Sequence, residues 1–158
     1  MQPDDRVLEI GCGHGVAVTS ICEKLSAPGH VTALDRSAKM IAAARARNAD
    51  AARRGIADFV TAELASAELE NSYYDKVLGI HVPVFARGDP ASEFAALRAC
   101  LAPDGQVFLS YQPLQASTMP SVIERVSAAA TGNGFDVDDV VTEELSSGWT
   151  VCLQLSAG

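Results

Sequence analysis

Basic side chains are scarce in this chain: 12 Lys and Arg stand against 20 Asp and Glu in 158 residues, which gives a formal net charge of −8. A surface with this charge repels phosphate backbones, so nucleic acid is not a favoured partner. No apolar run reaches about 18 residues, which argues against a membrane-spanning helix. No charged segment followed by an apolar one opens the chain, as it would in a secretory signal. We therefore expect a soluble, cytoplasmic protein without a membrane partner.

Paired cysteines and metal-ligand spacings are also missing. The four cysteines are scattered, with no C-x-x-C pair among them: Cys12, Cys22, Cys100 and Cys152. This pattern is typical of reduced, mostly buried thiols in the cytosol. The three histidines show no zinc-ligand spacing with these cysteines, so we expect no metal. Without repeats or linkers, a chain of 158 residues is expected to form a single domain over residues 1–158.

The most informative segment is VLEIGCGHG at residues 7–15, where a buried-strand pattern leads into three alternating glycines. A helical pattern follows at once. Glycine has no Cβ and tolerates positive φ, so a strand-to-helix turn of this kind lets the backbone approach a ligand closely. In a parallel sheet such a turn binds nucleoside-type cofactors at the carboxyl ends of the strands.

Strand and helix patterns alternate along the rest of the chain. Strands are expected over 6–10, 30–35, 57–62, 74–80 and 107–111. Four helices are expected. The first covers 16–26, and the second runs from an N-cap at Ser37 to Arg54. The third follows Asp89-Pro90, which would be its N-cap and N1 residues, and runs as far as Leu101, and the fourth covers 121–131. The segment 64–71 fits either a short helix or a loop.

The last two strand-like runs, 135–144 and 149–155, are joined by four residues only. A connection this short cannot make a parallel crossover, so the two strands must pair as an antiparallel hairpin. The sequence therefore predicts a doubly wound α/β fold. Its mostly parallel seven-stranded sheet has helices on both faces and ends in a C-terminal antiparallel hairpin.

A carboxylate ends the second expected strand, because Asp35 follows Gly15 by 20 residues. In this position a carboxylate can accept hydrogen bonds from both hydroxyls of a ribose. The alternative is a cap for the following helix or a solvated strand end. Together with the glycine turn, the spacing favours the ribose role.

The glycine spacing separates two classes of cofactor. Dinucleotide sites use G-x-G-x-x-G, but Val16 stands where the third glycine would be and the glycine falls at position 15. In addition, Glu9 lies two residues before Gly11, where it would repel a pyrophosphate and attract a cation. Both departures argue against NAD.

At these positions the chain resembles the class I S-adenosylmethionine-dependent methyltransferases, over nearly its whole length. Residues 7–15 are similar to their first motif, and residues 31–35 are similar to their second, which carries the ribose carboxylate. Residues 59–63 resemble the segment whose acidic residue contacts the adenine amino group, which would give Glu63 that role. Further similar segments are the fourth strand at 74–78, the turn at 101–105 and the reversed last strand.

The resemblance implies S-adenosyl-L-methionine as the cofactor and S-adenosyl-L-homocysteine as the product. Glu9 can favour the cationic methionine end, through a water or the cofactor ammonium, unless its carboxylate is hydrogen-bonded to nearby backbone. Cys12 and His14 would contribute backbone, and Met40 would lie against the adenine unless it is an ordinary core residue. The expected cofactor-binding residues are Glu9, Gly11, Cys12, Gly13, His14, Asp35, Arg36, Met40, Ala62, Glu63, Leu64 and His81.

Methyl transfer from a sulfonium is an in-line displacement, which positioning of the two reactants can accelerate. A thiol or amine acceptor needs no protein base, whereas a hydroxyl needs one within about 2.6–3.2 Å of its proton. His81 follows the fourth strand and is the candidate catalytic base, although the favoured interpretation is that only its backbone carbonyl touches the cofactor. The sequence HVPVF at 81–85 is not the Asn/Asp-Pro-Pro-Tyr/Phe of enzymes that methylate amino groups of bases or glutamine.

The resulting hypothesis is a methyltransferase that acts on an oxygen or nitrogen of a small molecule. The alternative is a methyltransferase-like cofactor-binding subunit that needs a partner for activity. The chain begins almost directly on the first expected strand and so lacks the N-terminal helices that cover the cofactor in relatives. We therefore expect a cleft that is open, that is covered by a second copy in a homodimer or by a partner subunit, or that is completed by a region outside this sequence.

Overall fold

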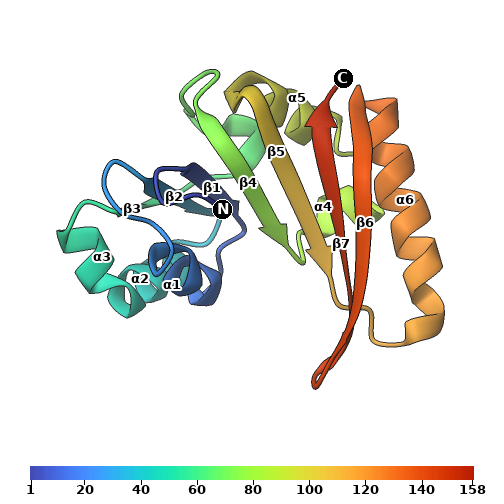
Figure 1. Cartoon of the computed structure of the whole chain (residues 1–158), viewed down its shortest axis with the longest axis horizontal. Helices are drawn as coiled ribbons and strands as arrows, with labels where there is room; N and C mark the ends of the chain where they lie inside the picture. The colour runs from blue at the N-terminus through green and yellow to red at the C-terminus, as the bar shows by residue number, and fades with distance from the viewer.

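The computed structural model describes residues 1–158 and contains one seven-stranded sheet in the order β3-β2-β1-β4-β5-β7-β6 (Figure 1). Strands β1 to β5 pair in parallel, and β7 runs antiparallel to both of its neighbours. The predicted fold, a mostly parallel sheet closed by a hairpin, is confirmed. The strand bounds are β1 Arg6–Ile10, β2 His30–Asp35, β3 Ala57–Thr61, β4 Tyr74–Ile80, β5 Leu101–Tyr111, β6 Phe135–Leu145 and β7 Gly148–Ala157.

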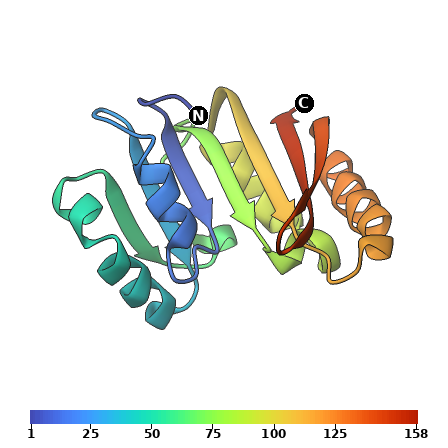
Figure 2. The ribbon, with the colours of Figure 1, turned by 60° about the horizontal axis from the view of Figure 1, so that its bottom comes forward.

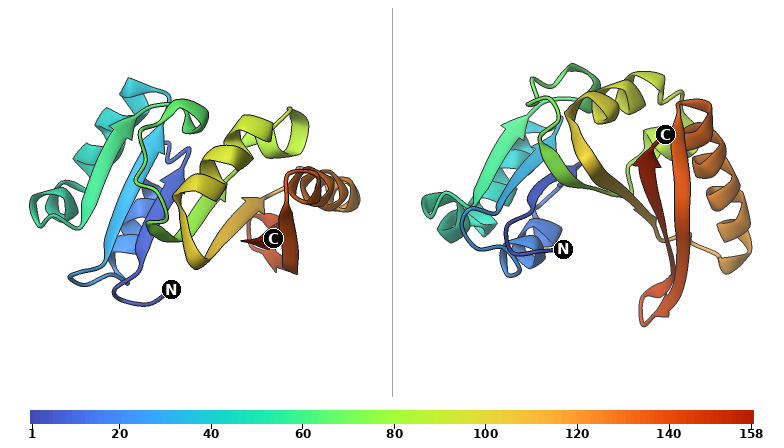
Figure 3. Two further views of the ribbon diagram at one scale, coloured as in Figure 1. Left: turned by 90° about the horizontal axis from the view of Figure 1, so that it is seen from above. Right: turned by 45° about the horizontal axis from the view of Figure 1, so that its top comes forward.

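The helices lie on opposite sides of this sheet, with α1 to α3 on one side and α4 to α6 on the other (Figure 3). None of them combines the length and the apolar character that crossing a bilayer requires. Their bounds are α1 Val16–Cys22, α2 Ala38–Arg47, α3 Ala49–Arg53, α4 Pro83–Arg87, α5 Ala91–Cys100 and α6 Met119–Gly132, with short 3-10 turns η1 Leu64–Ser66 and η2 Ala116–Thr118.

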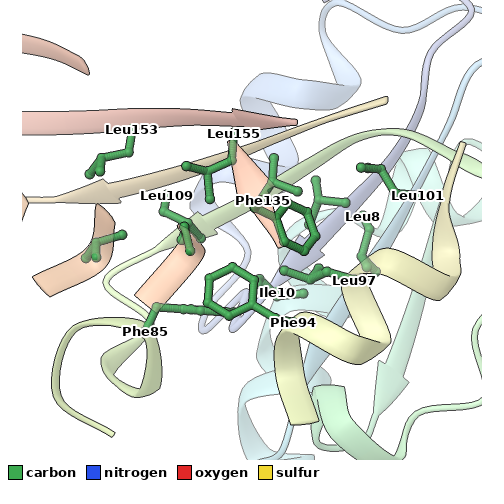
Figure 4. Close-up of a cluster of buried hydrophobic side chains, with 14 of the residues drawn as sticks. Leu8, Ile10, Phe85, Phe94, Leu97, Leu101, Leu109, Phe135, Leu153 and Leu155 are labelled. Carbon is green, nitrogen blue, oxygen red and sulfur yellow. The ribbon is translucent and has the colours of Figure 1, made fainter. Parts of the chain in front are cut away.

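Two apolar clusters flank the sheet because successive strand residues point to opposite faces. In β1, Val7 joins the cluster under α1 and α2, whereas Leu8 and Ile10 join the larger cluster under α4, α5 and α6. In the larger cluster the Phe94 ring lies 5.0 Å from that of Phe85 and 5.1 Å from that of Phe135 (Figure 4). These contacts link α4, which follows the carboxyl end of β4, to α5, and they link α5 to the start of β6.

The alanine-rich helix predicted as far as Arg54 is interrupted. Asn48 leaves helical geometry with φ −108° and ψ 30°, and it divides the segment into α2 and α3. An asparagine side chain can compete with helix hydrogen bonds by bonding to nearby backbone, and here it donates to the carbonyl oxygen of Ala44 at 3.0 Å. The predicted start and end of the segment are confirmed, since Ser37 is the N-cap and Gly55 has φ +71°.

Other predicted helix bounds were wrong. The first helix ends at Cys22 rather than at residue 26, and Leu101 opens β5 instead of ending α5. The N-cap of α5 is Pro90, although the Asp89 carboxylate still accepts a hydrogen bond from the Ala91 N–H at 3.4 Å. The fourth strand ends at Ile80 as predicted, and Pro83 is the first residue of a short helix that was not predicted, where its missing N–H costs nothing.

Candidate functional site

A cleft of about 490 Å³ opens at the carboxyl ends of β1 to β4. The connection from β1 leads to β2 on one side, and the connection from β4 leads to β5 on the other, so the cleft lies at the point where the winding of the sheet reverses. Its lining comes from the residues that follow these strands: Gly11, Asp35, Arg36, Ala62, Glu63, Leu64, His81, Val82, Pro83 and Val84, with Ile10, Leu34 and Glu93.

The turn after β1 needs glycine at two positions for different reasons. Gly13 has φ +51°, and a Cβ built on it would meet no heavy atom within 4 Å. Its missing side chain therefore leaves backbone accessible. Gly15 has φ +73°, and a Cβ there would lie 2.7 Å from Asn48 Nδ2 and 2.8 Å from Ala44 Cβ. The second glycine thus allows α2 to pack directly on the turn.

Asp35 ties this turn to the end of β2. Its Oδ2 accepts a hydrogen bond from the Gly13 N–H at 3.0 Å, and its Oδ1 accepts one from the Ser37 N–H at 2.8 Å. The carboxylate therefore helps to start α2, which was the alternative to a ribose role. A carboxylate has about four acceptor sites, so these two bonds leave capacity for a ligand in the cleft. The ribose role stays a prediction.

The α2–α3 junction holds the glycine turn from the other side. Arg47 Nε donates to the His14 carbonyl oxygen at 3.0 Å, and Asn48 Nδ2 donates to the Gly15 carbonyl oxygen at 2.9 Å. The Asn48 Oδ1 accepts a hydrogen bond from the Thr19 hydroxyl at 2.8 Å, and the residue is only 6% exposed. The sequence analysis missed these positioning residues. The only local signal was an asparagine inside an alanine-rich helix.

Glu9 lies in β1, before the glycine turn, on the face of the sheet that packs against α1. It is 2% exposed, and its Oε2 atom has no hydrogen-bond partner, so the backbone-bonded alternative is not seen for this oxygen. Burial raises the pKa of Glu9 to about 7, because a carboxylate is costly in an apolar environment. The pKa of the neighbouring Cys12 thiol is raised to about 12, mainly by burial and to a smaller extent by the charge of Glu9. This thiol therefore stays protonated at neutral pH.

His81 stands at the end of β4 with φ +55°, a backbone region in which histidine is enriched among non-glycine residues. Its N–H donates to the Ser110 carbonyl oxygen at 2.9 Å, and its ring meets the Tyr111 ring edge-on at a centroid distance of 6.4 Å. The Tyr111 hydroxyl donates to the Val82 carbonyl oxygen at 3.0 Å. These contacts fix the backbone while the imidazole remains exposed beside the cleft.

The predicted cofactor-binding residues are only partly gathered in the lining of the cleft. Those that line it are Gly11, Asp35, Arg36, Ala62, Glu63, Leu64 and His81. Glu9 is buried, Cys12, Gly13 and His14 form the adjoining turn outside the lining, and Met40 is half-buried in the first turn of α2. Their contacts with a ligand stay predictions.

Four lining residues were not predicted from the sequence: Val82, Pro83 and Val84 at the start of α4, and Glu93 in α5. No sequence pattern indicated that the starts of α4 and α5 lie at the carboxyl ends of the strands. No group of three His, Cys, Asp or Glu side chains has the arrangement of a metal site.

Comparisons with known proteins agree with this geometry. A family model described as a methyltransferase domain matches residues 7–105. A 37.1 kDa protein of transposon Tn4556 from Streptomyces fradiae is 29% identical over 137 residues, which are 85% of this chain and 38% of that protein. The chain therefore spans well under half the length of this relative.

Solved structures of the same fold are more distant in sequence. A SAM-dependent methyltransferase from Aquifex aeolicus superposes with a TM-score of 0.79 at 16% identity, covering 98% of this chain and 84% of that one. Magnesium protoporphyrin IX methyltransferase from Synechocystis, with bound SAM, gives a TM-score of 0.70 at 19% identity, covering 99% and 71%. At this identity the likeness shows the fold.

The buried carboxyl group of Glu9 predicts that stability falls as pH rises. Its pKa is about 7 in the fold against 4.5 for an exposed group, so the folded state binds more protons than the unfolded state between these values. The stability is fully present below pH 4.5 and is lost by about pH 7, a change of about 3 kcal/mol. Glu9→Gln should therefore exceed the wild type in free energy of unfolding at pH 8 by about this amount.

Urea unfolding of both proteins at pH 5 and pH 8 measures this difference. At pH 5 the advantage of Glu9→Gln should shrink to less than about 1 kcal/mol. Glu124→Gln is the matched control, because this glutamate is exposed on α6 and the substitution should leave stability nearly unchanged at both pH values. An equal advantage of Glu9→Gln at pH 5 and pH 8 would show that ionisation is not the cause.

Proposed function

The chain belongs to the methyltransferase-domain family, and we propose that it transfers the methyl group of S-adenosyl-L-methionine to an oxygen or nitrogen of a small molecule. The observation that carries this proposal is a glycine turn whose open backbone adjoins a cleft at the switch point of the sheet. On this proposal residues 1–158 act as one methyltransferase domain.

The residues of the site fit the methionine end of this cofactor. A Cβ on Gly13 would occupy open space, so a ligand has room to approach the backbone of the turn. Glu9 offers a buried carboxylate oxygen without a partner, and a nearby cation compensates such a charge. We assign the methionine end to Gly11, Cys12, Gly13 and His14, with Glu9 favouring its positive charge.

The nucleoside end fits the other half of the cleft. Asp35 keeps free acceptor capacity for the ribose hydroxyls, as its two hydrogen bonds use only part of its carboxylate. Glu63 is exposed at the end of β3 and lines the cleft between Ala62 and Leu64, where it would accept a hydrogen bond from the adenine amino group. Arg36 and Met40 complete the assigned set.

When bound, the cofactor supplies an electrophilic methyl group on a sulfonium. The chain contributes mainly by holding the two reactants in line, since orientation alone removes much of the barrier. For a hydroxyl acceptor a base is also needed. His81 would take the proton at its imidazole, and its exposure beside the cleft leaves the ring accessible. An amine acceptor needs no base, so His81 would then contribute only the contact of its backbone with the cofactor.

The proposed function predicts selective binding of the sulfur nucleosides. Titration calorimetry should detect S-adenosylmethionine and S-adenosylhomocysteine but not NAD, because Glu9 and the position of Gly15 disfavour a pyrophosphate. Incubation with S-adenosylmethionine and a panel of small hydroxyl and amine compounds should then release S-adenosylhomocysteine. Binding without turnover for any acceptor, unless a partner protein is added, would instead indicate a cofactor-binding subunit. Binding of NAD alone would refute the proposal.

Removal of the Asp35 carboxylate should weaken cofactor binding. Hydrogen bonds to a charged acceptor contribute roughly 1.5–3 kcal/mol each, so Asp35→Ala should raise the Kd for S-adenosylhomocysteine about 10- to 100-fold. Asp58→Ala is the control, because this exposed carboxylate lies near the amino end of β3. Because Asp35 also holds the glycine turn, weaker binding by Asp35→Ala could come from a disturbed turn or from a lost ribose contact. A second ligand separates these two causes. The 2′-deoxy analogue should bind the wild type more weakly, and this penalty should vanish in Asp35→Ala.

The role of His81 depends on the acceptor. If the imidazole is the base, His81→Ala should lower kcat on a hydroxyl acceptor about 10²- to 10⁴-fold and leave an amine acceptor nearly unaffected. Calorimetry with S-adenosylhomocysteine, run in parallel, reports whether the backbone contact to the cofactor survives. Unchanged turnover of a hydroxyl acceptor by His81→Ala would remove the base role.

A further inference from the structure

A second cavity of about 690 Å³ adjoins the cleft and shares His81 and Pro83 with it. Its walls come from α4, from the end of β5 with the loop that follows, and from the start of α6. Helices α4 and α6 pack against each other, and both lie near the carboxyl end of β5 (Figure 2). The cavity is therefore on the far side of His81 from the nucleoside-binding half of the cleft.

The charge of this cavity is opposite to that of the chain. Arg87 of α4 and Arg125 of α6 line it, and no Asp or Glu does. Neither arginine forms an ion pair or a side-chain hydrogen bond in the structure; the ion pairs that do form involve Arg6, His30, Arg53 and Arg54. Two free guanidinium groups facing one cavity are unexpected in a chain of net charge −8. Guanidinium groups match carboxylate and phosphate oxygens in pairs of hydrogen bonds.

We propose that the methyl acceptor carries an anionic carboxylate or phosphate group, which Arg87 and Arg125 bind. This inference rests on the proposed function and gives the acceptor its chemical class. The remaining lining suits an acceptor with a small apolar body, because Pro113, Val122 and the fully exposed Leu114 line the cavity together with Thr118 and Ser121. The acidic surface elsewhere opposes a polyanion, so the acceptor is a small molecule.

The shared wall at His81 connects this anchor to the chemistry. An acceptor held by Arg87 and Arg125 extends its nucleophile past His81 toward the cleft. The acceptor lone pair then forms the new bond to the methyl carbon, and the electron pair of the broken carbon–sulfur bond stays on sulfur, which becomes a neutral thioether. The acceptor proton passes to His81 or to water. The anionic group is the anchor and takes no part in the bond changes.

Small probes test this inference directly. Benzoate and phenyl phosphate represent the two anionic sources, and benzamide and benzylamine are their neutral and cationic counterparts. Titrations followed by protein NMR, with the protein saturated in S-adenosylhomocysteine, should show binding of at least one anionic probe at residues of the second cavity. The tighter of the two anions identifies the acceptor as a carboxylic acid or a phosphate ester. The neutral and cationic probes should bind at least about 10-fold more weakly.

Arginine variants assign the binding to the two guanidinium groups. Arg87→Gln and Arg125→Gln should each raise the Kd of the anionic probe about 10-fold or more. Arg53→Gln makes the same charge change on α3, outside the cavity, and should leave the Kd unchanged. Equal binding of benzamide and benzoate, or an unchanged Kd in both arginine variants, would overturn the inference. If the wild type does not bind S-adenosylhomocysteine at all, the proposed function is refuted. The same probe titration without S-adenosylhomocysteine then still tests the anion site.

Discussion

The glycine turn after β1 adjoins the cleft, and hydrogen bonds from neighbouring elements hold it in place. Asp35, at the end of β2, accepts the Gly13 N–H at 3.0 Å, and Asn48, at the break between α2 and α3, donates to the Gly15 carbonyl at 2.9 Å. The buried Cys12 side chain gives the turn one packing contact, and glycine loses more conformational freedom on folding than other residues, so these bonds help to offset the entropy cost of ordering the turn. The shape of the cleft depends on them, and the packing of α2 on Gly15 depends on the absence of a Cβ.

Charge is arranged differently on the two sides of His81. The cleft is lined by three carboxylates and one arginine, namely Asp35, Glu63, Glu93 and Arg36, and Glu9 is buried before the glycine turn. The adjoining cavity has arginines and no carboxylate. On the proposals above, a cationic methyl donor and an anionic acceptor are each attracted to the correct side by charge of opposite sign. His81 lines both cavities, so on the same proposals its imidazole is placed to accept a proton released by the acceptor.

Much of the fold could be predicted from residue patterns because it is decided locally. Buried strands were recognised from apolar runs, and the short connection at Leu145–Gly148 required an antiparallel hairpin. The helix from Ser37 was predicted as one piece, since most residues around Asn48 are alanine or arginine, which favour a helix. The break lies at Asn48, whose side chain donates both to the nearby Ala44 carbonyl and to the Gly15 carbonyl. The glycine turn lies more than one strand and one helix earlier in the chain.

By itself the sequence determined the order of the strands, four helical segments between them, the glycine turn, and acidic residues at or near strand ends, because each depends on the spacing of near neighbours. Only the tertiary structure decided that Glu9 is buried without a partner, that Asn48 supports the turn, and that Arg87 and Arg125 face one cavity. These features arise from contacts between segments that are distant in the chain, and the local periodicity of residues does not predict such contacts.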